Sequence, residues 1–567
     1  MACHFGLDFG ASSPSKGPNL VWSSLMLPPG LRSPREVVLY YEELYFSLVE
    51  SGTVYPCIYP WVSAGVAIVL AYLLVDHRNS PLLKVSRWPI FIMSTAFHIW
   101  CMLNMQARSA AAAFGLGLMC AWGILWIFAI TIVYDCQSDF KRYQLSGQDS
   151  NIKPVDDAIH KHSNGTTISN GQPTELRKRA GPVRDKTSDQ KQFTPSKRQR
   201  VFWQSYPSSL SVERLDWVLD VFTNFRGVGW TYETNGVPPA PYSVQIDLGM
   251  EPTSKQDADG KLTSKTGIRR YSNQSELLRH VAIGIAYGYL ALDAIKTIMH
   301  HDPYFWGYID AAAPHWLPDT VRQSSHLTKM YRMLLSLYAI YTALWYIFKL
   351  GPAFFCGILG PKSVGIRGEA WMNPYDMFGA YNNVLDKGLA GWWGGWWHQI
   401  FRFGFEAPAN RLLELLDIEK RSSLGKLISL FVAFFLSGCL HACGSFTQLG
   451  DTRPLSGPMC FFLLQAVGIV GQIATVQLLK KAGIAALCPI WLSRCLNFLL
   501  VNTWLYYTAP LLVDDFARGG VWLFEPVPFS PLRGLGLGQP DDKWYCFEHQ
   551  RIWWRTGHHW WDTGIAP

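Results

Sequence analysis

Uncharged stretches alternate with polar ones along the 567 residues of the chain. Eight stretches are apolar enough to cross a hydrocarbon core of about 30 Å as helices, at about 1.5 Å per residue. They cover residues 57–75, 88–105, 110–134, 281–299, 333–348, 427–446, 459–479 and 482–513. The fourth is the weakest, because Asp293 and Lys296 interrupt it. The pattern predicts an all-α, polytopic membrane protein with about eight transmembrane helices.

The polar stretches divide this chain into segments. Residues 1–56 form an N-terminal extramembrane segment, and residues 57–134 hold the first three helices. A long loop spans 135–278, and its part 146–200, rich in Ser, Thr, Gly, Asp, Lys and Gln, has the composition of a disordered basic insert. Residues 279–512 hold the remaining helices, and 513–567 form a C-terminal tail. Residues 1–36 lack the apolar run of a signal peptide, so we expect the first span to act as the insertion signal.

Composition and charge support a membrane protein and suggest its orientation. Charged residues are only 16% of the chain, against about 25% in soluble globular domains, and aromatic residues reach 14%. The net charge is +8, and Lys84, Lys480 and Lys481 lie in short loops between spans. The positive-inside tendency places these loops and the long basic loop in the cytoplasm, with the N-terminus outside. The sequons at Asn164 and Asn273 would then face the side where glycans are not added. A solvated cytoplasmic loop also explains the basic clusters better than nucleic-acid binding.

A histidine inside an uncharged span is the first candidate for chemistry. His441 lies in the span 427–446, where ionisable groups are costly and often functional. A neutral imidazole suits a general base that acts on an alcohol, although a purely structural histidine remains the alternative. Ser437 lies four residues earlier on the same helical face and is able to orient the ring. Cys439 and Cys443 point away from His441, so we expect no metal site.

A tryptophan-rich stretch before the sixth span holds the second candidate set. His398 and Arg402 are four residues apart, so they share a face if this stretch is helical. Arg402 suits bidentate binding of phosphate or carboxylate, and Trp397 lies beside His398. The alternative is an aromatic helix that lies in the membrane interface.

Other transferase and hydrolase motifs are absent or weak. No G-x-S-x-G sequence and no glycine-rich phosphate loop occurs. His315 and Asp319 match an H-x-x-x-D motif, but two fixed letters in five residues arise easily by chance.

Three motifs in order resemble the membrane-bound O-acyltransferases, and specifically their wax-synthase-like branch in fungal secondary metabolism. They are Asn224-Phe225-Arg226-Gly227-Val228-Gly229-Trp230, the Trp397-His398 pair followed by Arg402, and Ser437-Gly438 followed by His441. The resemblance covers residues 210–512. It implies a helical membrane fold that encloses a reaction tunnel, with His441 as general base and His398 as a positioning residue. Arg402, Trp397 and Ser437 would then line the site of the substrate and coenzyme A (CoA).

The resemblance also implies an activity. Acetyl-CoA would be the co-substrate, with no bound cofactor and no metal, and the acceptor would be a hydroxyl of a hydrophobic terpenoid or meroterpenoid. We expect an integral membrane protein of the endoplasmic reticulum whose partners are the acyl-CoA, the hydrophobic alcohol and the lipid bilayer, with no nucleic acid. Long-chain wax ester synthesis is an alternative within this class. A multispanning transporter and a non-catalytic scaffold are alternatives from other classes, although no internal repeat typical of many transporters is visible.

Overall fold

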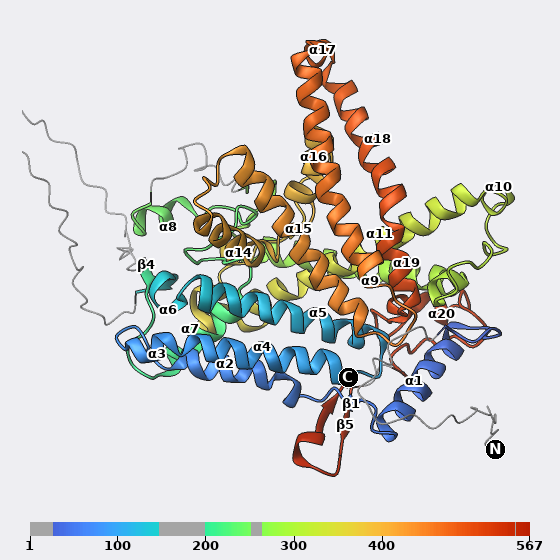
Figure 1. Ribbon diagram of the computed structural model, residues 1–567, viewed down its shortest axis with the longest axis horizontal. Helices are drawn as coiled ribbons and strands as arrows, with labels where there is room; N and C mark the ends of the chain where they lie inside the picture. Colours follow the sequence, from blue (N-terminus) through green and yellow to red (C-terminus); the bar gives the residue numbers. More distant parts are fainter. Residues whose placement is uncertain (1–25, 147–198, 251–262, 550–551) are drawn as a thin grey trace, which may run out of the picture.

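The computed structural model describes residues 26–146, 199–250, 263–549 and 552–567, and it is mostly helical (Figure 1). The α-helices are α1 (Pro34–Glu50), α2 (Ala64–Leu74), α3 (Pro81–Val85), α4 (Arg87–Asn104), α5 (Ala110–Ile127), α6 (Cys136–Asp139), α7 (Val212–Thr223), α8 (Tyr242–Asp247), α9 (Gln274–His300), α10 (Asp319–Arg322), α11 (Ser325–Pro352), α12 (Gly360–Val364), α13 (Asn382–Gly391), α14 (Arg402–Leu415), α15 (Ser423–Phe446), α16 (Cys460–Lys481), α17 (Ile484–Leu487), α18 (Ile490–Thr508), α19 (Pro510–Arg518) and α20 (Pro531–Gly534). Four π-helical segments, η2 (Phe128–Val133), η5 (Ala353–Leu359), η8 (Trp392–Trp396) and η9 (Leu455–Met459), adjoin them. The strands are β1 (Tyr55–Pro56), β2 (Met105–Gln106), β3 (Arg142–Leu145), β4 (Val201–Gln204), β5 (Trp553–Arg555) and β6 (Gly564–Ala566).

The expected all-α membrane architecture is confirmed, but the count of eight spans is not. Six helical segments among the described residues are long and apolar enough to cross a membrane: Ala110–Val133, Gln274–His300, Ser325–Gly368, Ser423–Phe446, Leu455–Lys481 and Ile490–Arg518. The first two expected spans correspond to α2 and α4. The apolar helix that contains α2, Trp61–Leu74, is too short to reach across a bilayer by itself, and α4 begins with a charged residue and carries several polar ones.

The connections between the long helices gather in two sets. One set joins the ends around β1 and β2, where Arg108 pairs with Glu42 at 2.6 Å and Tyr59 bridges to Ile565 near the C-terminus. The other set joins opposite helix ends, through contacts such as His77 with Asp135 at 3.1 Å. The connection between α4 and α5 lies in the first set, and the connections before α4 and after α5 lie in the second, so α4 and α5 run in opposite directions.

The long segment before α9 is folded on both sides of residues 147–198, which lie outside the described residues. Strands β3 and β4 pair antiparallel, so the expected insert 146–200 leaves the fold at one end of this hairpin and returns there. Arg142 in β3 pairs with Asp216 at 2.9 Å and Asp220 at 3.1 Å of helix α7. Nearly all of the insert lies outside the described residues, as does the sequon at Asn164. The side chain of Asn273, the other sequon, caps the start of α9 by accepting from the Glu276 N–H.

Close packing of α5 against α15 fixes the helix that carries His441. A Cβ added to Gly117 would overlap the Cys443 carbonyl, so only glycine permits this approach. The Thr447 hydroxyl bonds across the interface, donating to the Ala113 carbonyl at 2.7 Å. Small residues and hydroxyls at helix crossings are typical of membrane proteins, where close backbone approach replaces the hydrophobic effect as the driving force.

Candidate active site

The tryptophan-rich stretch runs along two transmembrane helices. Asp386 in α13 pairs with Arg494 at the start of α18, at 2.7 Å. Further along, the Leu389 N–H donates to Gln472 of α16 at 2.9 Å, and the Trp393 indole donates to Gln465 at 3.3 Å. Gln465 lies two helical turns from Gln472, which corresponds to about 10 Å along the helix axis. The chain therefore enters between the helices before it reaches His398.

His441 has the hydrogen bond that a general base needs. Its Nδ1 lies 2.8 Å from the backbone carbonyl oxygen of Ser437, one helical turn earlier. A carbonyl only accepts, so Nδ1 carries the hydrogen and Nε2 keeps its lone pair. The ring also packs on Phe462 of α16, with centroids 4.4 Å apart. The backbone of Ser437 orients the imidazole, and not its hydroxyl, which was the group expected from the sequence.

His398 lies within a cage of aromatic rings. The centroids of Phe348, Phe378, Trp397 and Phe401 lie between 5.5 and 6.5 Å from its own. Its Nδ1 is buried and has no hydrogen-bond partner. Burial, followed by the nearby His441 and Arg226, lowers the pKa of His398 to about 3. His398 is therefore neutral at pH 7, with one ring nitrogen left for a substrate. A chain of ring contacts through Phe462, Trp393 and Trp397 connects it to His441.

The remaining predicted residues take different places. Trp397 belongs to the aromatic cage. Arg402 donates to Glu406 at 2.7 Å and to the Gln399 side chain at 3.1 Å, so its guanidinium is already engaged. It begins α14 and is not on a helix shared with His398, because the chain forms a turn between residues 397 and 401. Across the residues with described positions, no cluster of three His, Cys, Asp or Glu side chains is able to hold a metal ion.

The geometry of the loop 224–230, which contains the first motif, accounts for its asparagine and glycine residues. The Asn224 side chain accepts from the Val228 N–H at 3.0 Å and donates to the Val228 carbonyl at 3.0 Å, which closes a tight loop. Gly227 and Gly229 adopt φ of 66° and 76°, the left-handed region that glycine enters without strain. Arg226 in this loop donates from Nη1 to the Asp376 carbonyl at 3.4 Å. The motif alone predicted no role for this arginine.

Comparison with known proteins relates part of the chain to a family. Residues 374–464, which contain both His398 and His441, match the model of the "Membrane bound O-acyl transferase family". This part of the chain is similar to the membrane-bound O-acyltransferases, and the match supports an acyltransferase enzyme. The six helices that are long and apolar enough to cross a membrane support an integral membrane protein.

Its relatives include three fungal proteins named acetyltransferases. The chain is 24% identical over 346 residues to acetyltransferase pyr8 of Aspergillus fumigatus, covering 58% of this chain and 71% of that protein. Identity to acetyltransferase spyB of the same fungus is 25%, covering 52% of this chain and 46% of that protein. Identity to acetyltransferase aurG of Calcarisporium arbuscula is 23%, covering 58% and 71%. The chain thus spans less than half of one of these relatives. No solved structure matches it.

Proposed function

We propose that the protein transfers an acetyl group from acetyl-CoA to a hydroxyl of a hydrophobic secondary metabolite, of terpenoid or meroterpenoid type, in the endoplasmic reticulum membrane. The acetyltransferase names of the relatives support the acyl group and the class of reaction. The observation that carries the mechanism is the bond between His441 Nδ1 and the Ser437 carbonyl at 2.8 Å, since it leaves Nε2 free to accept a proton.

The reaction then follows from the two histidines. His441 Nε2 takes the proton of the acceptor hydroxyl while the hydroxyl oxygen attacks the carbonyl carbon of the thioester. The tetrahedral intermediate collapses as the carbon–sulfur bond breaks, and the CoA thiolate takes the proton from His441. His398, neutral and with Nδ1 unpartnered, positions the thioester beside His441. Exclusion of water by the aromatic rings around His398 limits hydrolysis of the thioester.

A substitution of the base tests this mechanism. His441→Ala should lower the turnover number about 10²- to 10⁴-fold, the usual cost of losing a general base. Microsomes would be incubated with labelled acetyl-CoA and a panel of hydroxylated terpenoids, and ester formation measured. His326→Ala is the matched control, because His326 is exposed on α11 and bonds only to Tyr506 at 2.8 Å. Near-normal turnover in a correctly inserted H441A protein would refute the role of His441.

The length of the transferred acyl chain distinguishes the proposed acetyl transfer from wax ester synthesis. Equal concentrations of acetyl-CoA and palmitoyl-CoA would compete in one assay. Each buried CH₂ contributes about 0.8 kcal/mol, so a site open to long chains would strongly prefer palmitoyl. The cage around His398 leads us to expect acetyl esters. Predominance of palmitoyl esters would make the protein a wax-ester-type synthase.

The positive-inside tendency gives an orientation that is open to test. We propose that the connection 416–422 faces the cytoplasm and that the connection 319–324 faces the lumen. Cysteines introduced at the exposed positions Arg421 and Gln323 would be labelled in sealed microsomes with an impermeant thiol reagent, above the background of the parent chain. Labelling of R421C alone is expected, and labelling of Q323C alone would reverse the orientation.

A further inference from the structure

We propose that Arg226 and Arg270 form a buried site for a phosphate group of the acyl-CoA donor, beside the two histidines. This inference rests on the proposed function, because it names how the same site holds its donor.

The two guanidiniums are buried with donors that have no acceptor. Arg226 is 7% exposed and Arg270 is 2% exposed. Arg226 Nη1 makes one long bond to the Asp376 carbonyl at 3.4 Å, and Arg270 Nη1 donates to the Pro239 carbonyl at 2.8 Å. The Nε and Nη2 atoms of both residues are buried and have no hydrogen-bond partner among residues 26–146, 199–250, 263–549 and 552–567. A buried donor without an acceptor is costly, so four such donors on two cations indicate a place for an anion.

The surrounding charges leave a positive excess. Glu233 accepts from the Gly229 N–H at 3.1 Å and is the carboxylate that faces both arginines. The Asp376 carboxylate accepts from the Trp345 indole at 3.2 Å and lies 3.5 Å from Lys349 Nζ, so it already has a cation of its own. Burial lowers the pKa of Arg226 to about 10, still well above neutrality. Arg226 therefore remains charged at pH 7, and burial also lowers the pKa of Arg270.

The site adjoins the proposed acyl-transfer centre through contacts that do not involve charge. Phe225, next to Arg226, and Phe401, three residues after His398, pack on the same ring of Trp122, with centroids 5.1 and 4.5 Å away. The Asp376 carbonyl that Arg226 contacts lies two residues before Phe378, a wall of the cage around His398.

Phosphate is the anion that fits both the cluster and the substrates. The acceptor alcohol is apolar, whereas the donor carries a pyrophosphate and a 3′-phosphate. Guanidinium groups bind phosphate oxygens through two parallel N–H bonds, which the paired Nε and Nη2 atoms of each arginine are placed to donate. Arg402, the residue that the sequence suggested for this task, already donates from Nε to Glu406 and from Nη1 to Gln399.

An acyl donor without phosphate groups tests the contact between the two arginines and phosphate. Acetyl-CoA and S-acetyl-pantetheine carry the same thioester, but only acetyl-CoA carries phosphates. For Arg226→Gln and Arg270→Gln, we expect the KM for acetyl-CoA to rise about 10- to 100-fold, as for a lost bond to a charged group, while kcat/KM for S-acetyl-pantetheine stays unchanged. R226K, which keeps the charge without the fork, should fall between R226Q and the parent protein. Arg411→Gln, on the exposed face of α14, is the control.

Binding of labelled CoA without acceptor gives a readout independent of turnover. The dissociation constant should rise in R226Q and R270Q, and 3′-dephospho-CoA distinguishes the 3′-phosphate from the pyrophosphate as the bound group. An unchanged CoA affinity, or an equal loss of kcat with both donors, would overturn the phosphate site. If the parent protein forms no acetyl ester from either donor while still binding CoA through Arg226, the proposed function fails and the site stands.

Discussion

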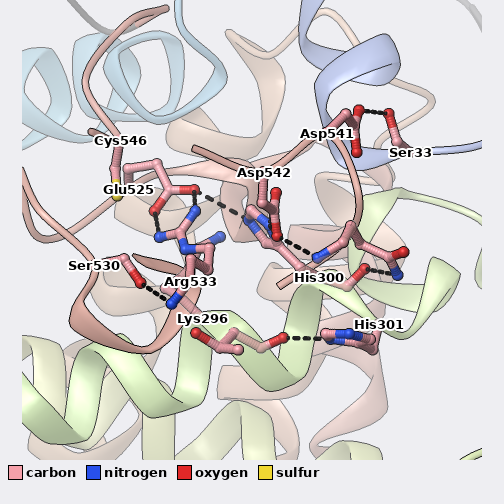
Figure 2. Close-up of polar contacts among 12 residues, drawn as sticks. Ser33, Lys296, His300, His301, Glu525, Ser530, Arg533, Asp541, Asp542 and Cys546 are labelled. Carbon is pink, nitrogen blue, oxygen red and sulfur yellow. Dashed lines mark hydrogen bonds and ion pairs between the residues drawn. The ribbon is translucent and has the colours of Figure 1, made fainter. Parts of the chain in front are cut away.

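Two buried clusters of charge lie at opposite ends of helix α9, and they differ in whether the chain completes them. The 27 residues of α9 separate the two by about 40 Å. Arg270 and Arg226 lie near its start, and some of their donors have no acceptor within the described part of the chain. Lys296 and His300 lie near its end, where the C-terminal segment supplies partners (Figure 2). The comparison suggests which buried charges hold the fold and which await a ligand.

The C-terminal cluster pairs most of its charged groups with one another, and only Arg533 Nε among its arginine nitrogens lacks a partner in the part of the chain that the structure describes. His300 lies between Glu525 at 3.0 Å and Asp542 at 2.9 Å, and Arg533 makes two bonds to Glu525 at 3.0 and 2.7 Å (Figure 2). Lys296 donates to the Trp522 carbonyl. Residues 521–549 are therefore not a loose tail, and they explain why α9 tolerates charges inside an apolar segment.

Breaking this network should have the largest effect on stability. Glu525→Gln removes the carboxylate that pairs with both His300 and Arg533, and loss of one partner of a buried ion pair costs about 3–5 kcal/mol. Thermal unfolding in detergent measures the loss. The control is Glu548→Gln, which removes an exposed pair with Lys543 and should cost at most about 1 kcal/mol. Equal melting temperatures for E525Q and the parent would show that the network is not structural.

Acidification should weaken the same network. Burial alone would raise the pKa of Glu525, but Lys296, His300 and Arg533 together lower it below its ordinary value of 4.5. The pKa of Asp542 is also lowered, by His300 against the effect of burial. A lowered pKa in the folded state means that stability is fully present above pH 4.5 and falls as the pH drops toward the folded values. The melting temperature should decrease below pH 4.5, and less steeply in E525Q. A steeper decrease in E525Q would contradict this assignment.

Removing a charge from the cluster of Arg226 and Arg270 should not destabilise the fold, in contrast to the loss expected for E525Q. Arg226→Met deletes two unpartnered donors and one long bond, so the protein should keep its stability or gain about 1–3 kcal/mol. The same variant should lose affinity for CoA. Thermal unfolding in detergent, with and without CoA, measures both. A loss of stability as large as that of E525Q would mean that Arg226 has a structural partner.

The sequence predicted what depends on local pattern and missed what depends on distant contacts. Uninterrupted apolar runs identified the helices around His441. The spacing of one helical turn between Ser437 and His441 predicted that these two residues would interact. The partner atom was wrong, because a backbone carbonyl and a side-chain hydroxyl at the same position give the same pattern. Asp293 and Lys296 weakened the prediction of α9, since the C-terminal residues that bond to them lie over 200 positions away.

The anion site was beyond sequence reasoning for a related reason. Arg226, Arg270 and Arg402 are equally plausible phosphate ligands as letters in a chain. The folded arrangement shows that Arg402 has acceptors three and four positions away, whereas the acceptor of Arg226 is the carbonyl of Asp376, 150 positions away. A search for arginines without an acidic or amide residue one helical turn away would have favoured Arg226 over Arg402.

Arg402→Gln should have the smallest effect and sharpens the distinction between the arginines. Its ion pair with Glu406 is partly exposed, with side chains 28% and 42% accessible, and such pairs contribute at most about 1 kcal/mol. Because its donors are engaged, the KM for acetyl-CoA should change less than about 5-fold, the equivalent of about 1 kcal/mol. The assay is the comparison of acetyl-CoA with S-acetyl-pantetheine, with R226Q measured in parallel. A rise for R402Q that matches R226Q and disappears with the truncated donor would show that Arg402 exchanges its bond to Glu406 for one to phosphate, and the donor site would then extend to α14.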